Sequence, residues 1–287
     1  MRAWIMAARP QTLPAAIAPV AVGTAVAHAA GGSRGGPALA ALAGALLLQV
    51  ASNLANDVFD HEKGADGPDR LGPPRAVACG LLRPRAVRCA LFLVLGAAMA
   101  VGAYLTLVAG WKVVALGLLA MACAVAYTGG PVPLGYHGLG DLLVLLFFGF
   151  AAVCGTAFVQ LGRVPAESLW AALPVGALAT AILVVNNLRD RAGDAACGKR
   201  TLAVRFGARG ARLEYALLIA IAFLVPAAAA AARGELLLAL PLAALPWALA
   251  LVRAVWRRDG RALNPILPAT ARLLLMTSLL WAAGIAL

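Results

Sequence analysis

The chain has 287 residues, of which 63% are hydrophobic and 13% charged, and its mean hydropathy is +0.88. This composition excludes an ordinary water-soluble domain and is typical of a protein that crosses a membrane several times. The net charge of +12 does not call for a nucleic-acid partner, because membrane topology and contact with anionic lipid account for it.

Nine apolar runs, taken in chain order, are long enough to cross a bilayer as helices. Eight of them contain no Lys, Arg, Asp or Glu, and the ninth is interrupted only by Arg272. Runs of about 20 residues match helices rather than the shorter alternating strands of membrane barrels. The sequence therefore predicts an all-α membrane protein, and we expect one membrane domain over residues 1–287 with no soluble module. The nine predicted spans are 10–33, 35–56, 89–111, 113–140, 142–162, 168–188, 215–232, 236–252 and 262–287.

The cations fall mainly on one side of this arrangement. With nine spans, 19 of the 24 Lys and Arg residues lie at the N-terminus or in loops that share one side of the membrane. The positive-inside rule places that side in the cytoplasm. The five cysteines form no CxxC pair and the three histidines show no ligand spacing, so we interpret both sets as structural.

Two acidic stretches follow the second and the sixth predicted spans. The first, NLANDVFDHEKGADGPDR at 53–70, holds five of the 12 acidic residues, and the second is NNLRDRAGDAACGKRTLAVRFG at 186–207. Four membrane crossings separate the two stretches, so they emerge on the same side. With Asp57 aligned to Asp190, they resemble an internal repeat about 133 residues apart.

Each stretch places one Asn and two Asp on one helical face, at i, i+4 and i+7 in the first and at i, i+4 and i+8 in the second. These residues are Asn53, Asp57 and Asp60, and Asn186, Asp190 and Asp194. Carboxylates packed this closely raise one another's pKa unless a positive group lies between them.

Oxygen ligands without His or Cys suit Mg²⁺, which takes one or two carboxylates and completes its shell with water and phosphate oxygens. The predicted metal ligands are Asp57, Asp60, Asp66, Asp190 and Asp194. The predicted diphosphate-binding residues are Arg9, Asn53, Asn56, Arg70, Arg75, Asn186, Asn187, Lys199 and Arg200. The alternative is that these acids are solvated loop charges that compensate nearby basic residues at the membrane surface. That alternative predicts neither the internal repeat nor the Asn residues beside the Asp residues. Arg9 also fits a simple positive-inside flank.

The motifs NDVFD and RDRAGD resemble the two aspartate-rich motifs of the UbiA superfamily of intramembrane prenyltransferases. Further blocks over most of 8–210, including ARPQTLPAAIAPVAVGTA, DRLGPPRAVACGLL and YTGGPVPLGYHGLGD, resemble the 1,4-dihydroxy-2-naphthoate prenyltransferase branch. One departure is Gly64, where the superfamily motif has an acid. The next acid is Asp66, which leaves open whether Asp66 contacts metal or only basic neighbours.

The resemblance implies nine helices in a ring around an apolar central cavity that opens sideways to lipid. It also implies Mg²⁺-dependent transfer of a prenyl group from a polyprenyl diphosphate to 1,4-dihydroxy-2-naphthoate, with decarboxylation to demethylmenaquinol, at the bacterial plasma (inner) membrane. Tyr127 matches a tyrosine that we assign to the active-site wall, although a Tyr at a helix end is also a common interfacial anchor. Asp190 is a candidate both for metal binding and for removing the acceptor's proton.

Two other functions compete with this one. Another superfamily member would use 4-hydroxybenzoate or haem as its acceptor. A membrane transporter would be expected to carry acids at the membrane midplane, whereas the acids here lie at helix ends.

Overall fold

The computed structural model describes residues 1–64, 70–131 and 133–287, and over these ranges the chain is all-helical, as predicted, with no β-strand. The first half comprises α1 (Arg2–Ala8), η1 (Pro10–Thr12), α2 (Pro14–Ala29), α3 (Gly35–Glu62), α4 (Pro84–Ala109), α5 (Lys112–Ala126) and η2 (Leu134–His137). The second half comprises α6 (Gly140–Val144), the π-helical turn η3 (Leu145–Ala151), α7 (Ala152–Leu161), α8 (Ala166–Ala196), α9 (Leu202–Arg233), η4 (Leu236–Ala244), α10 (Leu245–Arg257), η5 (Gly260–Leu263) and α11 (Ile266–Ala286).

The predicted count of nine spans is not confirmed. Within the described ranges, seven helical segments are long and apolar enough to cross a membrane, and the bent pair Arg2–Thr12 and Pro14–Ala29 makes an eighth if it is one span. In the predicted run 113–140 the one α-helix of more than a single turn among the described residues is the 15-residue α5, because the sequence TGGPVP at 128–133 does not favour a continuing helix.

The bend near the N-terminus has a local cause. Arg9 adopts the left-handed conformation, with φ 50° and ψ 69°, and it is the one non-glycine residue with positive φ among those described. This conformation ends α1, and the chain resumes as a helix at Pro14 with a bend of 46°. Residues 9–12 consequently lie at the polar end of the molecule.

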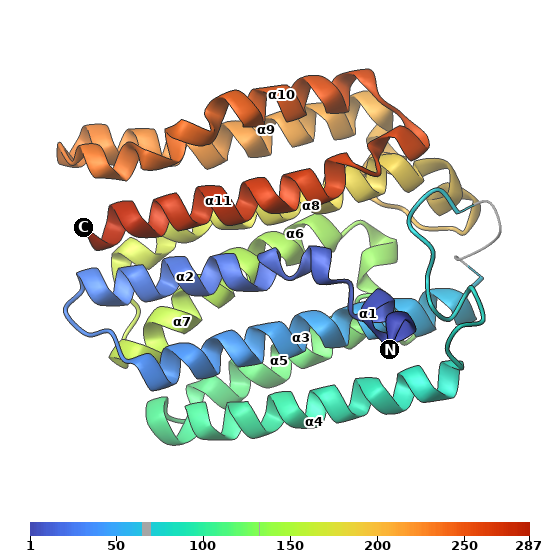
Figure 1. Cartoon of the computed structure of the whole chain (residues 1–287), viewed down its shortest axis with the longest axis horizontal. Helices are drawn as coiled ribbons and strands as arrows, with labels where there is room; N and C mark the ends of the chain where they lie inside the picture. The colour runs from blue at the N-terminus through green and yellow to red at the C-terminus, as the bar shows by residue number, and fades with distance from the viewer. Residues whose placement is uncertain (65–69, 132) are drawn as a thin grey trace.

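The helix α8 lies at the centre of the bundle and α4 at its edge. In α8, 72% of the helix's own apolar 18-residue window is buried inside the protein, whereas in α4 the corresponding share is 17%. Small residues allow close helix packing around α8, since a Cβ on Gly149 would lie 2.9 Å from the Cα of Gly176. In Figure 1, α9 and α10 form one edge of the bundle and α4 the opposite edge.

The two helices that carry the acidic stretches run in the same direction. Their C-terminal ends lie at the same end of the bundle, beside the connection that leads from α3 to α4 (Figure 1). Both helices continue past the predicted apolar runs, α3 to Glu62 and α8 to Ala196. The acids are therefore held on helix rather than in loops, as the helical spacing predicted.

A cavity of about 1700 Å³ lies among the helices. Its polar end is lined by residues from the C-terminal ends of α3 and α8, and the remainder is lined by apolar residues of α2, α4, α5, η3 and α7. Leu107 and Leu118 line the cavity and are also 88% and 52% exposed at the surface. The cavity therefore opens sideways between helices on the α4 and α5 side.

This arrangement predicts which positions share one side of the membrane. Cys197 is exposed at the polar end, whereas Arg34 precedes α3 at the other end. In variants that keep Cys197 alone, or carry Arg34→Cys alone, a membrane-impermeant maleimide should label position 197 only from the cytoplasmic side and position 34 only from the other. Cys79, tested in the same way, should match Cys197. Labelling of Cys79 and Cys197 from opposite sides would contradict the shared polar end.

Candidate active site

Asp60 is the centre of the polar end of the cavity. It is 2% exposed, near the end of α3. One of its oxygens pairs with Nη1 of Arg75 at 2.8 Å, and the other accepts from Nζ of Lys199 at 3.3 Å and from the hydroxyl of Tyr136 at 3.1 Å. A buried carboxylate is stable only when it is compensated in this way. Asp60 therefore joins α3, the connection after it, η2 and the segment that follows α8.

Lys199 bridges the two acidic helices. Besides Asp60, its ammonium lies 3.8 Å from an oxygen of Asp194 on α8. The ring of Tyr136 lies beneath this ammonium, with 4.6 Å from Nζ to the ring centroid. The ends of the predicted repeat thus face each other across one shared cation.

The Tyr136 hydroxyl remains a hydrogen-bond donor to Asp60 over the whole working pH range. Burial, and then the negative charge of Asp60, raise the pKa of this phenol above its ordinary value of about 10. Tyr136 therefore keeps its hydrogen bond to the Asp60 carboxylate.

Asp190 has a more rigid partner than Asp60. Arg189, 4% exposed, donates to both carboxylate oxygens of Asp190 at 2.8 and 2.6 Å, to Asn186 at 2.7 Å and to Asn264 at 3.2 Å. Asn264 in turn donates to the main-chain oxygen of Leu71 at 2.9 Å. These contacts fasten the connection after α3 to α8 and to the start of α11.

A close backbone approach completes this fastening. A Cβ at position 72 would lie 2.7 Å from Nη2 of Arg189, so glycine leaves room for the guanidinium in its present position and a larger residue would displace it.

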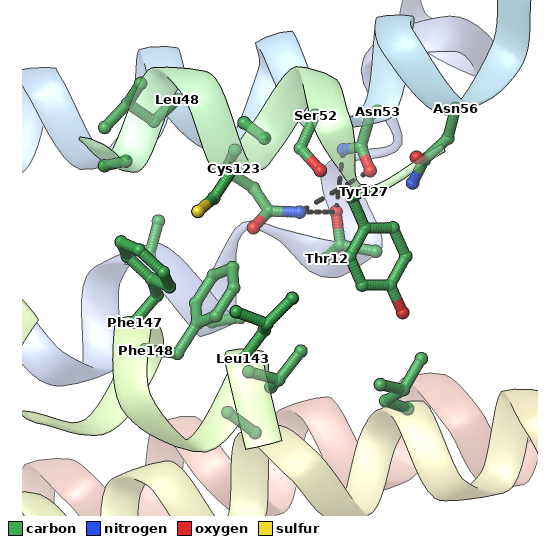
Figure 2. A pocket seen from close by; sticks show the side chains of 18 of the residues that line it. Thr12, Leu48, Ser52, Asn53, Asn56, Cys123, Tyr127, Leu143, Phe147 and Phe148 are labelled. Carbon is green, nitrogen blue, oxygen red and sulfur yellow. Dashed lines mark hydrogen bonds between the residues drawn. The ribbon is translucent and has the colours of Figure 1, made fainter. Parts of the chain in front are cut away.

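The asparagines of α3 position neighbouring segments. Asn53 donates at 2.9 Å both to the main-chain oxygen of Ala8 and to the hydroxyl of Thr12, which holds the N-terminal bend against α3 (Figure 2). Asn56 accepts from the hydroxyl of Thr128 at 3.0 Å, and its main-chain oxygen accepts from Arg75.

Most of the predicted site residues line the cavity. They are Arg9, Asn53, Asn56, Asp60, Arg70, Arg75, Tyr127, Asn186, Asn187, Asp190, Asp194 and Lys199. Arg200 is not in this lining, and its main-chain N–H donates to the main-chain oxygen of Tyr136 at 2.8 Å. Asp66 lies outside the described residues.

Asp57 also lies outside the cavity lining. It is 1% exposed, and its carboxylate accepts from the main-chain N–H of Val77 at 3.4 Å. At about 100° per residue, Asp57 is rotated by about 40° from Asn53 in one direction, whereas Asn56 and Asp60 are rotated in the other. The cavity face of α3 therefore carries Asn53, Asn56 and Asp60, and a metal-binding role for Asp57 stays a prediction.

Three residues of the site were not predicted as such: Arg189, Tyr136 and Asn264. Arg189 precedes the predicted Asp190, so its proximity was available from the sequence. Tyr136 lies within the quoted motif YTGGPVPLGYHGLGD. Asn264 lies beyond the last quoted motif, and its role depends on tertiary contacts that a single sequence does not reveal.

The residues at the polar end suit a divalent cation together with a phosphorylated ligand. The acids that line it, Asp60, Asp190 and Asp194, are oxygen donors. In the described part of the chain, no three His, Cys, Asp or Glu side chains gather as a closed metal cage, and Mg²⁺ characteristically binds through one or two carboxylates, water and phosphate. The cations that line the same end outnumber these acids: Arg9, Arg70, Arg75, Arg189 and Lys199.

The fold and this charged cavity define an all-helical membrane protein whose cavity has a cation-rich mouth and an apolar interior. The model of the UbiA prenyltransferase family matches residues 16–283. The chain belongs to the UbiA prenyltransferase family.

Named relatives agree with this assignment. A 1,4-dihydroxy-2-naphthoate octaprenyltransferase of Mycobacterium tuberculosis is 40% identical over 289 residues, which cover 99% of this chain and 95% of that protein. A UbiA homologue from Aeropyrum pernix K1 matches with a TM-score of 0.72 and 18% identity, over 96% of this chain and 98% of that chain. A UbiA homologue from Archaeoglobus fulgidus bound to GPP and Mg²⁺ matches with a TM-score of 0.67 and 17% identity, over 99% of both chains.

The different environments of Asp190 and Asp194 predict different effects on stability. Asp190→Asn leaves the buried guanidinium of Arg189 without its ionic partner and should lower the free energy of unfolding by about 3 kcal/mol. Asp194→Asn removes only a contact of 3.8 Å and should cost less than about 1 kcal/mol. Thermal unfolding of the purified variants in detergent measures the difference. Equal destabilisation of both variants would show that the Arg189 network is not the stronger one.

Proposed function

We propose that this chain transfers a polyprenyl group from a polyprenyl diphosphate to 1,4-dihydroxy-2-naphthoate, with loss of the carboxyl group as CO₂, to give demethylmenaquinol. Membership of the UbiA family and the relative that is 40% identical over nearly the whole chain support this activity. The observation that carries it is one cavity that combines a cationic, carboxylate-bearing end with a long apolar interior. A diphosphate headgroup with a polyprenyl tail has this same division of charge.

In this proposal Arg75 and Lys199 bind the diphosphate, together with Arg9, Arg70 and the asparagines at the helix ends. Asp60 and Asp194 hold Mg²⁺, with Asp190 as a further ligand. Mg²⁺, when bound, neutralises charge on the diphosphate and so assists its departure. The charges have the required sign, because the five named cations exceed the three named acids by two, and Mg²⁺ would add two further positive charges for the diphosphate to neutralise.

The protein's own groups lower the barrier by stabilising the leaving group. Lys199 is shared between Asp60 and Asp194 at 3.3 and 3.8 Å. Its ammonium can therefore turn to a bound phosphate oxygen. Asp60 and Asp194 would then keep a positive partner if Mg²⁺ were bound between them. Arginine and lysine charges in a water-poor site act most strongly on the charge that develops in the transition state. The apolar walls exclude water from the allylic cation and hold the tail.

Tyr127 lies on the wall between the charged end and the apolar interior. It lines the cavity, and Figure 2 shows its ring beside Asn56 with the hydroxyl directed away from the Asn53 and Thr12 contacts. This is where the acceptor ring must meet the first carbon of the prenyl chain, because that carbon lies next to the diphosphate.

The location follows from the same proposal. The apolar helices make the chain an integral membrane protein, and we place it in the bacterial plasma (inner) membrane, with the polar end and its loops in the cytoplasm. Residues 1–287 would act as one prenyltransferase domain. The substrates enter from opposite environments: the polyprenyl diphosphate from lipid and the naphthoate from the cytoplasmic face.

The acidic residues predict a metal-dependent activity. Asp60→Asn and Asp194→Asn should each lower Mg²⁺-dependent turnover by about 100-fold or more, because the amide keeps the shape of the side chain and loses its charge. Glu62→Gln is the matched control, since Glu62 pairs with Arg88 at the surface, and it should retain near-normal turnover. EDTA should abolish the wild-type activity and added Mg²⁺ should restore it. Near-normal turnover in both Asp variants would remove the acids from the site.

The acceptor can be identified by following its carboxyl group. Residues 128–141 contain no Lys or Arg, and the nearby Lys63 directs its ammonium to the main-chain oxygen of Thr128 at 2.6 Å. A fixed Lys or Arg bound to the substrate carboxylate would stabilise the ground state. It would therefore not accelerate a reaction in which that carboxylate leaves as CO₂. With 1,4-dihydroxy-2-naphthoate labelled by ¹⁴C in the carboxyl group, labelled CO₂ should form in step with unlabelled prenylated lipid. Label retained in the lipid, or equal use of 4-hydroxybenzoate, would refute the naphthoate assignment.

A further inference from the structure

A buried carboxylate outside the charged end of the cavity has no partner. Asp141, at the start of α6, is 6% exposed, and no other described residue donates a hydrogen bond to either of its carboxylate oxygens. Its main-chain oxygen, by contrast, is close to the hydroxyl of Thr180 at 3.5 Å. An unpartnered buried carboxylate costs several kcal/mol of desolvation, so Asp141 is a poor choice for structure alone.

The residue before Asp141 lies against the phenol of Tyr127. A Cβ at position 140 would lie 2.7 Å from the Tyr127 hydroxyl oxygen, and a Cβ at position 135 would lie 2.9 Å from its ring. The main-chain N–H of Gly135 also donates to the main-chain oxygen of Tyr127 at 2.9 Å. The two glycines thus form a cradle that fixes the ring and leaves its hydroxyl beside the start of α6.

Tyr127 borders both the cavity and the start of α6. Tyr127 belongs to the cavity lining and Asp141 does not. In Figure 2 the ring extends from the end of α5, and its hydroxyl points away from Asn53 and Thr12. The phenol is therefore a group of the cavity wall that also reaches the start of α6. It makes no hydrogen bond to Asp141 in this structure, and catalytic hydrogen bonds of this kind commonly form only once substrate is bound.

The charged groups around this pair do not neutralise Asp141. Glu214 on α9 and, through Tyr127, Asp60 and Asp194 contribute negative charge. Arg205 on α9 donates to the main-chain oxygens of His137 and Arg200 at 2.8 and 3.0 Å. Burial, together with the negative charge of Asp141, raises the pKa of Tyr127 above its ordinary value, so the phenol retains a proton that it can pass on.

Asp190 is less suited to accept a proton. Both of its oxygens already accept hydrogen bonds from Arg189 at 2.8 and 2.6 Å, and protonation would break that ion pair. The oxygens of Asp141 lose no such contact when a proton arrives.

We propose that Asp141 accepts and holds the proton of the aromatic acceptor during prenyl transfer, and that it acts through Tyr127. The phenolic hydrogen of the aromatic acceptor passes to the Tyr127 oxygen as the Tyr127 hydrogen passes to a carboxylate oxygen of Asp141. The electron pair of the broken O–H bond stays on the acceptor and increases the electron density of its ring. The ring carbon that bears the carboxylate then bonds to the allylic carbon, whose bond to the diphosphate oxygen breaks with the electron pair leaving on the diphosphate. The bond from this ring carbon to the carboxylate breaks next, CO₂ leaves, and the electron pair restores the aromatic ring. The proton held by Asp141 returns through Tyr127 to the phenolic oxygen, because the overall reaction releases no proton. This inference rests on the proposed function.

The test compares Asp141→Asn, Tyr127→Phe and the double variant in prenylation assays with purified protein, Mg²⁺, a polyprenyl diphosphate and 1,4-dihydroxy-2-naphthoate. Asp141→Asn should lower kcat by about 100-fold, with less than about a 2-fold change in the KM for the polyprenyl diphosphate. Tyr127→Phe should cause a similar loss, and the double variant should lose no more than the worse single variant, because the two residues serve one step. The Asp141→Asn defect should shrink with acceptors whose phenol is more acidic.

Stability separates this role from a structural one. Asp141→Asn removes a buried charge and should leave the melting temperature in detergent unchanged or raise it. Glu214→Gln, the matched control on α9, should keep wild-type turnover. Full activity of Asp141→Asn, a loss of its fold, a defect that is the same for every acceptor, or multiplicative losses in the double variant would each overturn the inference. A wild-type protein that prenylates no aromatic acceptor would instead refute the proposed function.

Discussion

The burial of the Asp60 carboxylate at the end of an apolar helix is the constraint on which the polar end depends. A lone carboxylate at 2% exposure would be strongly destabilising. Arg75, Lys199 and Tyr136 compensate it, and each comes from a different segment of the chain. The charge on α3 can therefore be buried only if the connection after α3, the turn η2 and the end of α8 all converge there. The fold of the cavity mouth follows from this need for compensation.

The same compensation makes the site suitable for a diphosphate. Its two halves differ in character: Arg189 holds Asp190 through two short contacts, whereas Lys199 lies at longer distances between Asp60 and Asp194. The first half serves to position the helix end and the connection at Leu71. The second half contains Lys199, whose ammonium is available to a phosphate oxygen in the proposed reaction. Asp60 and Asp194, its present partners, are the acids that we propose as metal ligands. Asp190, held by Arg189, and Asp194, near Lys199, thus lie on consecutive turns of α8.

Much of this organisation could be predicted from the sequence. The apolar runs predicted the helical segments, and the spacing of Asn and Asp predicted that α3 and α8 remain helical beyond the apolar runs, as they do to Glu62 and Ala196. Periodicity could not fix the last few tens of degrees of rotation, and for this reason Asp57 was grouped with the cavity-facing residues. The count of nine spans is not confirmed, because prolines and glycines at 128–133 limit α5 to 15 residues, a local signal that the absence of charge in that run does not reveal.

Contacts between distant segments were beyond a single sequence. The hydrogen bond from Asn264 to Leu71 joins residues 193 apart, and no local pattern marks either of them. The lack of a partner for Asp141 is likewise a property of packing, since an Asp at the start of a helix is an ordinary feature of a sequence.

The central claim is that Asp60 and Asp194 hold the metal while Lys199 and Arg75 hold the diphosphate. The most direct measurement is an experimental structure with Mn²⁺ in place of Mg²⁺ and a polyprenyl thiolodiphosphate that cannot ionise, with the metal located by its anomalous scattering. The account predicts metal density within bonding distance of Asp60 and Asp194 oxygens, and Lys199 and Arg75 in contact with phosphate oxygens. Metal bound away from both acids, or a diphosphate held with the Lys199 contacts to Asp60 and Asp194 unchanged, would contradict it.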